Sequence, residues 1–254
     1  MARFTPKLTP DGRAMLNLGC GWKMHAAWNN LDFSPYARLA RRPALTRLLR
    51  SVGIVSPLRA ERLARVDPEI LCWDLRHGIP FADGTFDVVY HSHFLEHLDR
   101  NVAAIVLTEC RRALKPGGIL RVVVPDWEKL THWYLDALRD WDAGKPGAAS
   151  RHGTAMHDLI DQMVRQDASG SAKASWVGKL ENWYRGGAAG TGELHRWMYD
   201  RRSLAALLES LGFREPRVET ARSSRVADWV SFGLDLNDDG GEYKPESLYL
   251  EVIR

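Results

Sequence analysis

Short apolar runs and amphipathic stretches alternate through the first half of the chain. Five runs are short and mostly apolar, several of them with β-branched or aromatic residues, and are bounded by Gly, Pro or Asp, which is typical of short strands. The predicted strands are Met15–Leu18, Asn30–Phe33, Ile70–Trp73, Phe86–Tyr90 and Ile119–Val124. Between the last two, apolar residues at helical spacing predict a helix over 101–114, ended by the Lys-Pro-Gly-Gly at 115–118. This alternation favours a parallel, doubly wound α/β sheet with right-handed crossovers.

The C-terminal part of the chain continues the pattern. Ser203–Leu211 is predicted as a helix capped by Ser203 and closed by Gly212. Arg217–Thr220 and Ser247–Val252 complete the set of strands. We therefore expect a single domain over 1–254 with two insertions.

The first insertion, 36–66, carries eight arginines and one acid, Glu61, interleaved with leucines. The pattern predicts one or two basic amphipathic helices, broken at Pro43 and Pro57. Such a face is either simply solvated or a peripheral contact with an anionic membrane or substrate. The second insertion, 128–192, begins as a helix and continues through glycine-rich stretches. Glycines at 144, 147 and 153 and beyond predict loops between helices, in a lid over the carboxyl ends of the strands.

The composition excludes several classes of protein. Of 254 residues 45% are apolar, enough for a packed core, and the net charge of +3 is too small to favour nucleic acid as a partner. The three cysteines are far apart and form no CxxC pair, and the acidic loop 223–245 lacks the full spacing of a calcium loop. We therefore expect no bound metal. The N-terminus shows no signal core and no uncharged run reaches about 18 residues, so a cytoplasmic location is expected.

Candidate chemistry begins at residues 15–32, MLNLGCGWKMHAAWNNLD. An apolar run breaks into Gly19-Cys20-Gly21, and the next apolar segment ends on Asp32. Glycine lets the backbone approach a ligand closely, and a carboxylate at the end of the next strand can accept hydrogen bonds from both hydroxyls of a ribose. The arrangement indicates a nucleoside-binding turn.

Three segments together resemble the class I S-adenosylmethionine-dependent methyltransferases. These are LNLGCG, the stretch CWDLRHGIPFADGTFDVVYHSHFLEHL from Cys72 to Leu98, and ALKPGGILRVVVPD from Ala113 to Asp126. More narrowly, W-x-N-L-D, HRWMYD and KPESLYLE resemble a bacterial subgroup associated with modifying glycan sugars or small metabolites. The resemblance implies a Rossmann-like, seven-stranded, mostly parallel sheet. The chain departs from the family where Lys23 replaces a third glycine, and its gap from Gly21 to Asp32 is too short for a full first helix.

The resemblance implies S-adenosylmethionine as the cofactor. The residues expected to bind it are Asn17, Gly19, Cys20, Gly21, Asp32, Asp74, Leu75, His91 and Ser92. The glycines approach its amino-acid part, Asp32 binds the ribose, and His91 and Ser92 border the methyl group. Asp74 is predicted to meet the adenine, with a helix cap as the alternative.

For proton removal we expect His195 or Asp126, with His93 as a further candidate, whereas His97 beside Glu96 is interpreted as structural. The acceptor is expected at Trp127, Tyr134, Arg196 and Trp197, whose rings otherwise pack within the lid. The absence of an NPPY-like motif favours O-methylation of a hydroxyl on a saccharide or small metabolite. N- or C-methylation, and a non-catalytic cofactor-binding partner subunit, stay open. The oligomeric state is open as well, a dimer included.

Overall fold

The computed structural model of the chain describes residues 4–42, 44, 46, 47, 51, 63, 64, 66–163 and 195–254. Most of the predicted basic insertion 36–66 and residues 164–192 of the second insertion therefore lie outside the described residues. The short helix α1 (Pro35–Ala40) is the described start of the first insertion, and the Ser34 hydroxyl caps it by accepting from the Ala37 amide.

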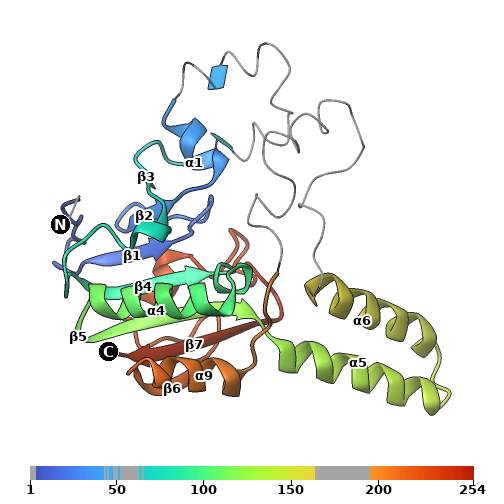
Figure 1. Ribbon diagram of the computed structural model, residues 1–254. Coiled ribbons are helices and arrows are strands. Elements are labelled where there is room, and N and C mark those ends of the chain that lie inside the picture. The colour runs from blue at the N-terminus through green and yellow to red at the C-terminus, as the bar shows by residue number, and fades with distance from the viewer. Residues whose placement is uncertain are drawn as a thin grey trace.

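Seven strands form one sheet in the order β3-β2-β1-β4-β5-β7-β6 (Figure 1). Their bounds are β1 Met15–Leu18, β2 Asn29–Asp32, β3 Leu71–Cys72, β4 Phe86–Ser92, β5 Leu114–Pro125, β6 Arg214–Glu219 and β7 Ser247–Ile253. Strands β1 to β5 pair in parallel, and β7 runs antiparallel to both β5 and β6. The predicted fold class is confirmed. Because the strand order reverses between β1 and β4, their carboxyl ends form the switch point where such sheets hold ligands.

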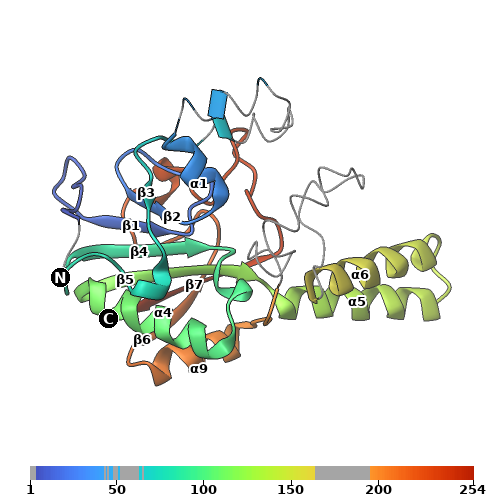
Figure 2. The same cartoon turned by 45° about the horizontal axis from the view of Figure 1, so that its top comes forward.

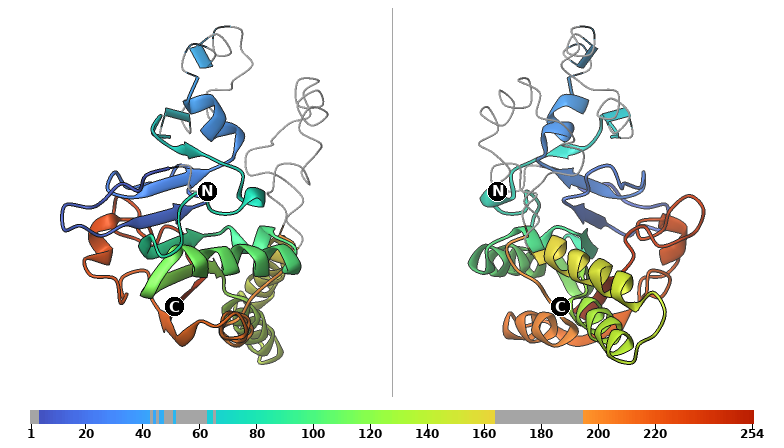
Figure 3. Two further views of the ribbon diagram at one scale, coloured as in Figure 1. Left: turned by 60° about the vertical axis from the view of Figure 1, so that its left-hand side comes forward. Right: turned by 90° about the vertical axis from the view of Figure 1, so that its right-hand side faces the viewer.

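One face of the sheet is covered by α4 (Arg100–Ala113) and α9 (Arg201–Ser210), which lie on the same side (Figure 3). Their apolar sides and the inward-facing residues of the strands form one core cluster, in which Val106, Leu107, Leu204 and Leu208 pack with Leu16 and Val89. The burial follows the helical period of the sequence, so this side of the sheet was predictable.

The opposite face is covered by the irregular segment 221–236, which includes the short turn η3 (Trp229–Phe232). Trp28 is the centre of this second core, with ring centroids 6.0 Å from Trp229 and 5.4 Å from Phe232. Edge-to-face packing of this kind stabilises aromatic clusters beyond their buried area. The segment thereby fixes the loop that leads into β7.

Arg121 lies in the middle of β5 and is fully buried. Its guanidinium donates to Asp235 and to Glu251, each at 2.8 Å, and to the Thr220 carbonyl at 2.7 Å. The Tyr90 hydroxyl donates to the other oxygen of Asp235 at 2.6 Å. Buried charges require such full pairing, so this network joins β5, β7, β4 and the segment before β7.

After β5 the chain forms a helical hairpin, α5 (Trp127–Asp142) and α6 (Ala148–Met163), which projects beyond the sheet (Figures 1 and 2). Gly144 and Gly147 lie in its turn with positive φ, as loop glycines were predicted to. The expectation of a loop at Gly153 is wrong, because this glycine lies inside α6. Small residues, among them Ala137 and Ala155, let the two helices pack closely.

Two predicted boundaries are corrected. The helix α9 is capped by Asp200, whose carboxylate accepts from the amides of Arg202 and Ser203, so the predicted cap Ser203 is instead the third helical residue. The strand β5 begins at Leu114 and includes the predicted break at 115–118, where the pairing with β4 shifts register. Within the described residues, no helix combines the length and apolar character needed to cross a bilayer.

Candidate active site

The turn after β1 requires glycine for two separate reasons. Gly19 and Gly21 have φ of +61° and +54°, which side chains other than glycine rarely adopt. A Cβ on Gly19 would also stand 2.8 Å from the ring of Phe94. The Gly19 amide donates to the Leu31 carbonyl at 2.8 Å, so the turn is held against the end of β2. Residues 19–28 form turns without a helix, as the short gap predicted.

Asp32 ends β2 and is 7% exposed. Its Oδ2 accepts from the Gly21 amide at 2.9 Å, and its Oδ1 accepts from the Ser34 amide. A carboxylate has lone pairs beyond these two bonds. Asp32 therefore fixes the glycine turn and keeps acceptor capacity at the edge where the carboxyl ends of β1 and β2 meet.

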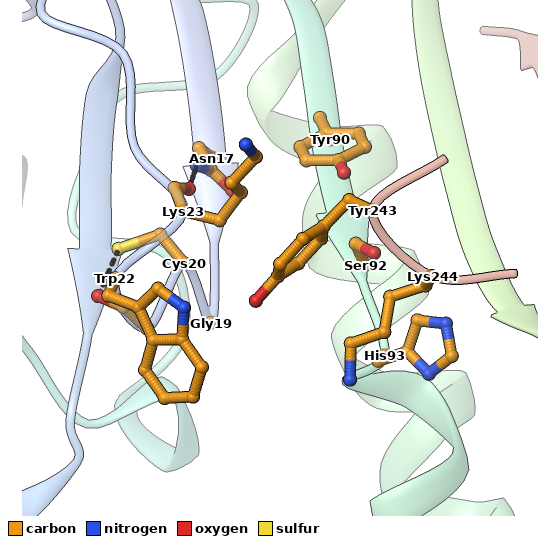
Figure 4. Close-up of a pocket in the computed structure, with 11 residues that line it drawn as sticks. Asn17, Gly19, Cys20, Trp22, Lys23, Tyr90, Ser92, His93, Tyr243 and Lys244 are labelled. Atoms are coloured by element: carbon orange, nitrogen blue, oxygen red, sulfur yellow. Dashed lines mark hydrogen bonds between the residues drawn. The ribbon is translucent and has the colours of Figure 1, made fainter. Parts of the chain in front are cut away.

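A pocket opens at the switch point, between the turn after β1 and the end of β4 (Figure 4). It is lined by Asn17, Gly19, Cys20, Gly21, Trp22, Lys23, Tyr90, Ser92, His93, Tyr243 and Lys244. Tyr243 points into the gap between the turn after β1 and β4. The lining combines backbone, hydroxyl, amide and charged groups from three distant segments, which is typical of a small-molecule site.

The sequence analysis did not predict four of the pocket residues, Trp22, Tyr90, Tyr243 and Lys244. It named Lys23 only as the residue that replaces a third glycine of the family motif. The Lys23 ammonium donates to the Leu236 carbonyl at 2.5 Å and lies 4.9 Å from the centroid of the Tyr243 ring. Burial lowers its pKa, and the carboxylates of the 235–238 loop partly oppose this. The lysine in place of a third glycine thus ties the turn to the loop before β7, a contact that local sequence does not reveal.

Beside the pocket, three imidazoles surround one carboxylate. Glu96, in the short turn η2 (Leu95–His97), is fully buried. Its Oε1 lies 3.2 Å from His93 Nδ1, 3.9 Å from His97 Nε2 and 4.0 Å from His195 Nε2. Burial by itself raises the pKa of Glu96, but the hydrogen bond from His93 and the charges of the three histidines outweigh it and lower the pKa to about 2.

The segment that follows residue 194 is fastened to this cluster. Both Arg196 and Trp197 direct their amides to the Glu96 carbonyl, the former at 2.7 Å. His195 Nδ1 lies 2.6 Å from the Gln162 carbonyl of α6. The sequence placed His195 and His93 among the candidate bases, and the structure brings both to Glu96.

The geometry can be compared with known proteins. Residues 16–122, which include the glycine turn, Asp32 and the β4 end, match a family described as methyltransferase domain. A Streptomyces fradiae protein, described as an uncharacterized 37.1 kDa protein in transposon TN4556, is 31% identical over 125 residues, which are 49% of this chain and 34% of that protein. The chain thus covers about a third of that relative's length.

Several solved structures that match the chain are methyltransferases. A SAM-dependent methyltransferase from Archaeoglobus fulgidus has 13% identity and a TM-score of 0.39, covering 94% of this chain and 85% of that one. The mitomycin 7-O-methyltransferase MmcR has 18% identity and a TM-score of 0.41, covering 94% and 48%. A Burkholderia thailandensis 1,6-didemethyltoxoflavin-N1-methyltransferase has 12% identity and a TM-score of 0.40, covering 94% and 70%. Sequence identity this low gives no information about the methyl acceptor of this chain.

The predicted cofactor residues fall into two groups. Asn17, Gly19, Cys20, Gly21 and Ser92 line the pocket together. Three further residues, Asp74, Leu75 and His91, are not among its lining residues. Their contacts with the cofactor stay predictions.

Asp74 lies two residues beyond β3 and caps the short turn η1 (Leu75–His77). Its Oδ1 accepts from the Arg76 amide at 3.0 Å, and the Arg76 guanidinium pairs with the same carboxylate. This pairing lowers the pKa of Asp74. The capping alternative is therefore observed, while Leu75 packs against the core beside it.

His91 is fully buried inside β4. Among the described residues, neither of its ring nitrogens has a hydrogen-bond partner, and its ring lies 5.8 Å from that of Phe94. Burial lowers the pKa of His91 to about 4, against a weaker opposing effect of the Glu96 charge. His91 thus supports the strand below the pocket.

Asp126, a predicted base, is the N-cap of α5. Its Oδ1 accepts from the amides of Glu128 and Lys129 at 3.0 and 3.3 Å. Burial raises the pKa of this half-buried carboxyl, partly offset by these bonds and the Lys129 charge. Asp126 and His195 are not among the pocket-lining residues, whereas His93 is.

The residues predicted to bind the acceptor are dispersed. The Tyr134 ring packs 5.2 Å from His152 within the hairpin, as the packing alternative expected. Arg196 pairs with Asp99 at 2.9 Å on the surface. Trp197 is 42% exposed, with the Arg100 guanidinium 4.5 Å from its ring.

Trp127 opens α5, and its amide donates to the Tyr199 carbonyl at 3.1 Å. Like Tyr134, Arg196 and Trp197, it is not among the pocket-lining residues. The described residues therefore do not bring the four together at one wall, and an acceptor role for them stays a prediction.

Proposed function

We propose that this chain is an O-methyltransferase, which transfers the methyl group of S-adenosylmethionine to a hydroxyl of a saccharide or small metabolite. The observation that carries the proposal is the position of Ser92 and His93. Both line the pocket at the end of β4, directly across from the glycine turn. Donor and acceptor must meet in line for this displacement, so polar side chains opposite the cofactor turn suit an acceptor that carries hydroxyls.

The cofactor is proposed to lie across the carboxyl ends of β1, β2 and β4. The backbone of Gly19 and Gly21 would approach its amino-acid part, and Asp32 would accept from the ribose hydroxyls while still bonded to the Gly21 amide. Tyr243 and Lys244 then close the pocket from the loop before β7. This arrangement replaces the missing first helix with side chains from a distant segment.

His93 is proposed as the base that receives the proton of the acceptor hydroxyl. As the new C–O bond forms and the C–S bond breaks, the hydroxyl proton must leave, and a histidine in contact is suited to receive it. His93 Nδ1 faces Glu96 at 3.2 Å, and Nε2 lies 2.8 Å from the Ser247 hydroxyl. The proton would pass to Nε2 once the acceptor hydroxyl has taken the place of the Ser247 hydroxyl at this nitrogen, with Glu96 stabilising the ring through Nδ1. Asp126 and His195 support this assignment less, because they do not line the pocket.

Cofactor binding is tested by calorimetry with S-adenosylmethionine. Asp32→Ala is expected to weaken binding at least tenfold, because both the ribose acceptor and the tether of the glycine turn are lost. Asp142→Ala, at an exposed position of α5, is the matched control and should bind like the parent chain. Equal affinity in both variants contradicts the proposed cofactor site.

Catalysis is tested by release of S-adenosylhomocysteine with saccharide and metabolite acceptors. His93→Asn is expected to lower kcat by about 10²- to 10⁴-fold, the usual contribution of a general base, with the KM for the cofactor unchanged. Turnover by the parent chain on amines and not on alcohols would favour the N-methyltransferase alternative. Binding of the cofactor without turnover on any acceptor would favour the partner-subunit alternative.

A further inference from the structure

We propose that Glu96, His97 and His195 bind one divalent transition-metal ion of the zinc class. One carboxylate oxygen and two imidazole nitrogens of these residues all lie within 4.8 Å of one another. Sequence analysis predicted no metal because the cysteines are isolated. The cluster forms only when the segment after residue 194 folds against the turn η2.

The distances suit a small ion. Zinc binds histidine nitrogen and carboxylate oxygen at about 2.0 to 2.2 Å, so neighbouring ligand atoms in a tetrahedral site stand about 3.4 Å apart. Glu96 Oε1 is 3.9 Å from His97 Nε2 and 4.0 Å from His195 Nε2. Side-chain rotations that shorten the distances between these ligand atoms by at most about 1.4 Å would bring them to the spacing of a tetrahedral zinc site. Two nitrogens and one oxygen favour zinc over magnesium or calcium, which prefer oxygen ligands.

Two of the proposed ligands, His195 and Glu96, are held in place by contacts of the kind found around metal sites. His195 Nδ1 lies 2.6 Å from the Gln162 carbonyl, which can only accept, so this nitrogen carries the hydrogen. In the neutral ring the lone pair is then on Nε2, the nitrogen directed at Glu96. A histidine ligand held by a backbone carbonyl through its other nitrogen is the usual arrangement around zinc. On the pocket side, His93 holds the Glu96 carboxylate in place at 3.2 Å.

The burial of the Glu96 carboxylate favours a cation at this site. The Glu96 side chain is 0% exposed, and a buried carboxylate is costly unless a positive charge compensates it. His195 Nε2 faces that carboxylate across 4.0 Å. An ion between the two atoms would supply the compensating positive charge. It would also join the end of β4 to the 195–199 segment and, through Gln162, to α6.

The test uses the full chain treated with chelator and then titrated with zinc chloride in a calorimeter. We expect one ion per chain with a dissociation constant below about 1 µM, as for built protein sites. Cobalt(II) should give the strong visible absorption of a tetrahedral N/O site, and zinc should raise the Tm. His97→Ala and His195→Gln should each weaken binding at least tenfold. His157→Ala, an exposed histidine of α6, is the matched control.

Two outcomes overturn the proposal. One is the absence of saturable binding by the chelated chain, which would mean that protonated imidazoles alone compensate Glu96. The other is equal affinity in His97→Ala, His195→Gln and the control. Because S-adenosylmethionine affinity is measured on the same samples, a variant that has lost its fold is recognised by losing both ligands. Ion binding is read without acceptor or turnover, so its failure is distinct from failure of the proposed reaction.

Discussion

Gly19 shows how a single residue meets a backbone demand and a packing demand together. Its place in a Gly-x-Gly after an apolar run was readable from the sequence, as was Asp32, because both belong to one local motif. The convergence of Glu96 and His195 was not readable, since 98 residues lie between them in the sequence and only the fold brings their side-chain atoms to 4.0 Å.

The first prediction separates the two demands on Gly19. Gly19→Ala should lower the free energy of unfolding by about 1 to 3 kcal/mol more than Gly21→Ala, because overpacking adds to the cost of a positive φ. Gly21 is the matched control, since it has φ +54° but no described atom within 4 Å of an added Cβ. Urea unfolding followed by tryptophan fluorescence measures the difference. Equal losses in the two variants would show that contact with Phe94 does not matter.

His91 gives a prediction for pH. Burial lowers its pKa in the folded chain to about 4, below the value of 6.5 expected when it is exposed by unfolding. The unfolded chain therefore binds the proton more readily. Its contribution to stability is complete above about pH 6.5 and is lost as the pH falls towards 4, by about 3 kcal/mol in all.

The measurement is the free energy of unfolding of chelator-treated protein between pH 7 and pH 4. His91→Leu should lose less stability over this range than the parent chain does. His157→Leu, at an exposed position, should follow the parent chain. If the three curves fall in parallel, His91 does not titrate as its burial implies.

At the scale of elements, the period of buried residues located most strands to within a few positions. The predicted boundaries of helices were wrong where two sequence features favoured different structures. Asp200 and Ser203 are both good cap residues, and their reciprocal bonds decide that Asp200 is the cap. The helix α6 was missed because Gly153 disfavours a helix locally, whereas packing against α5 stabilises it.

The cap of α9 gives the next prediction. Asp200→Ala should lower the free energy of unfolding by about 1 kcal/mol, because the amides of Arg202 and Ser203 lose their acceptor. Asp200→Asn keeps an acceptor oxygen and should cost a few tenths of that. Thermal unfolding followed by circular dichroism measures both. A loss in Asp200→Asn as large as in Asp200→Ala would assign the effect to charge rather than to capping.

At the scale of the whole molecule, the sequence predicted the sheet but not the network that fastens its two halves. The loop containing Asp235 was considered only as a calcium loop and dismissed. Its carboxylate instead pairs with Arg121, which the sequence shows as a charged residue inside an otherwise apolar strand. Long-range partners of this kind are set by tertiary folding, so no local pattern identifies them.

Arg121→Met should lower the free energy of unfolding by about 3 to 5 kcal/mol, because Asp235 and Glu251 would remain buried without their cation. Arg139→Met is the control, since the Arg139–Asp136 pair lies exposed on α5 and should change stability by less than about 1 kcal/mol. Urea unfolding measures both. Similar losses in the two variants would show that the buried network adds nothing beyond a surface pair.

The position of β7 has a consequence for biosynthesis. Translation reaches Ser247–Ile253 after the other six strands of the described sheet, yet this strand pairs on both sides, with β5 and with β6. Until it emerges from the ribosome, the nascent chain exposes the long unpaired edge of β5, the kind of edge that invites aggregation. A chaperone that shields that edge during synthesis would therefore raise the yield of native protein.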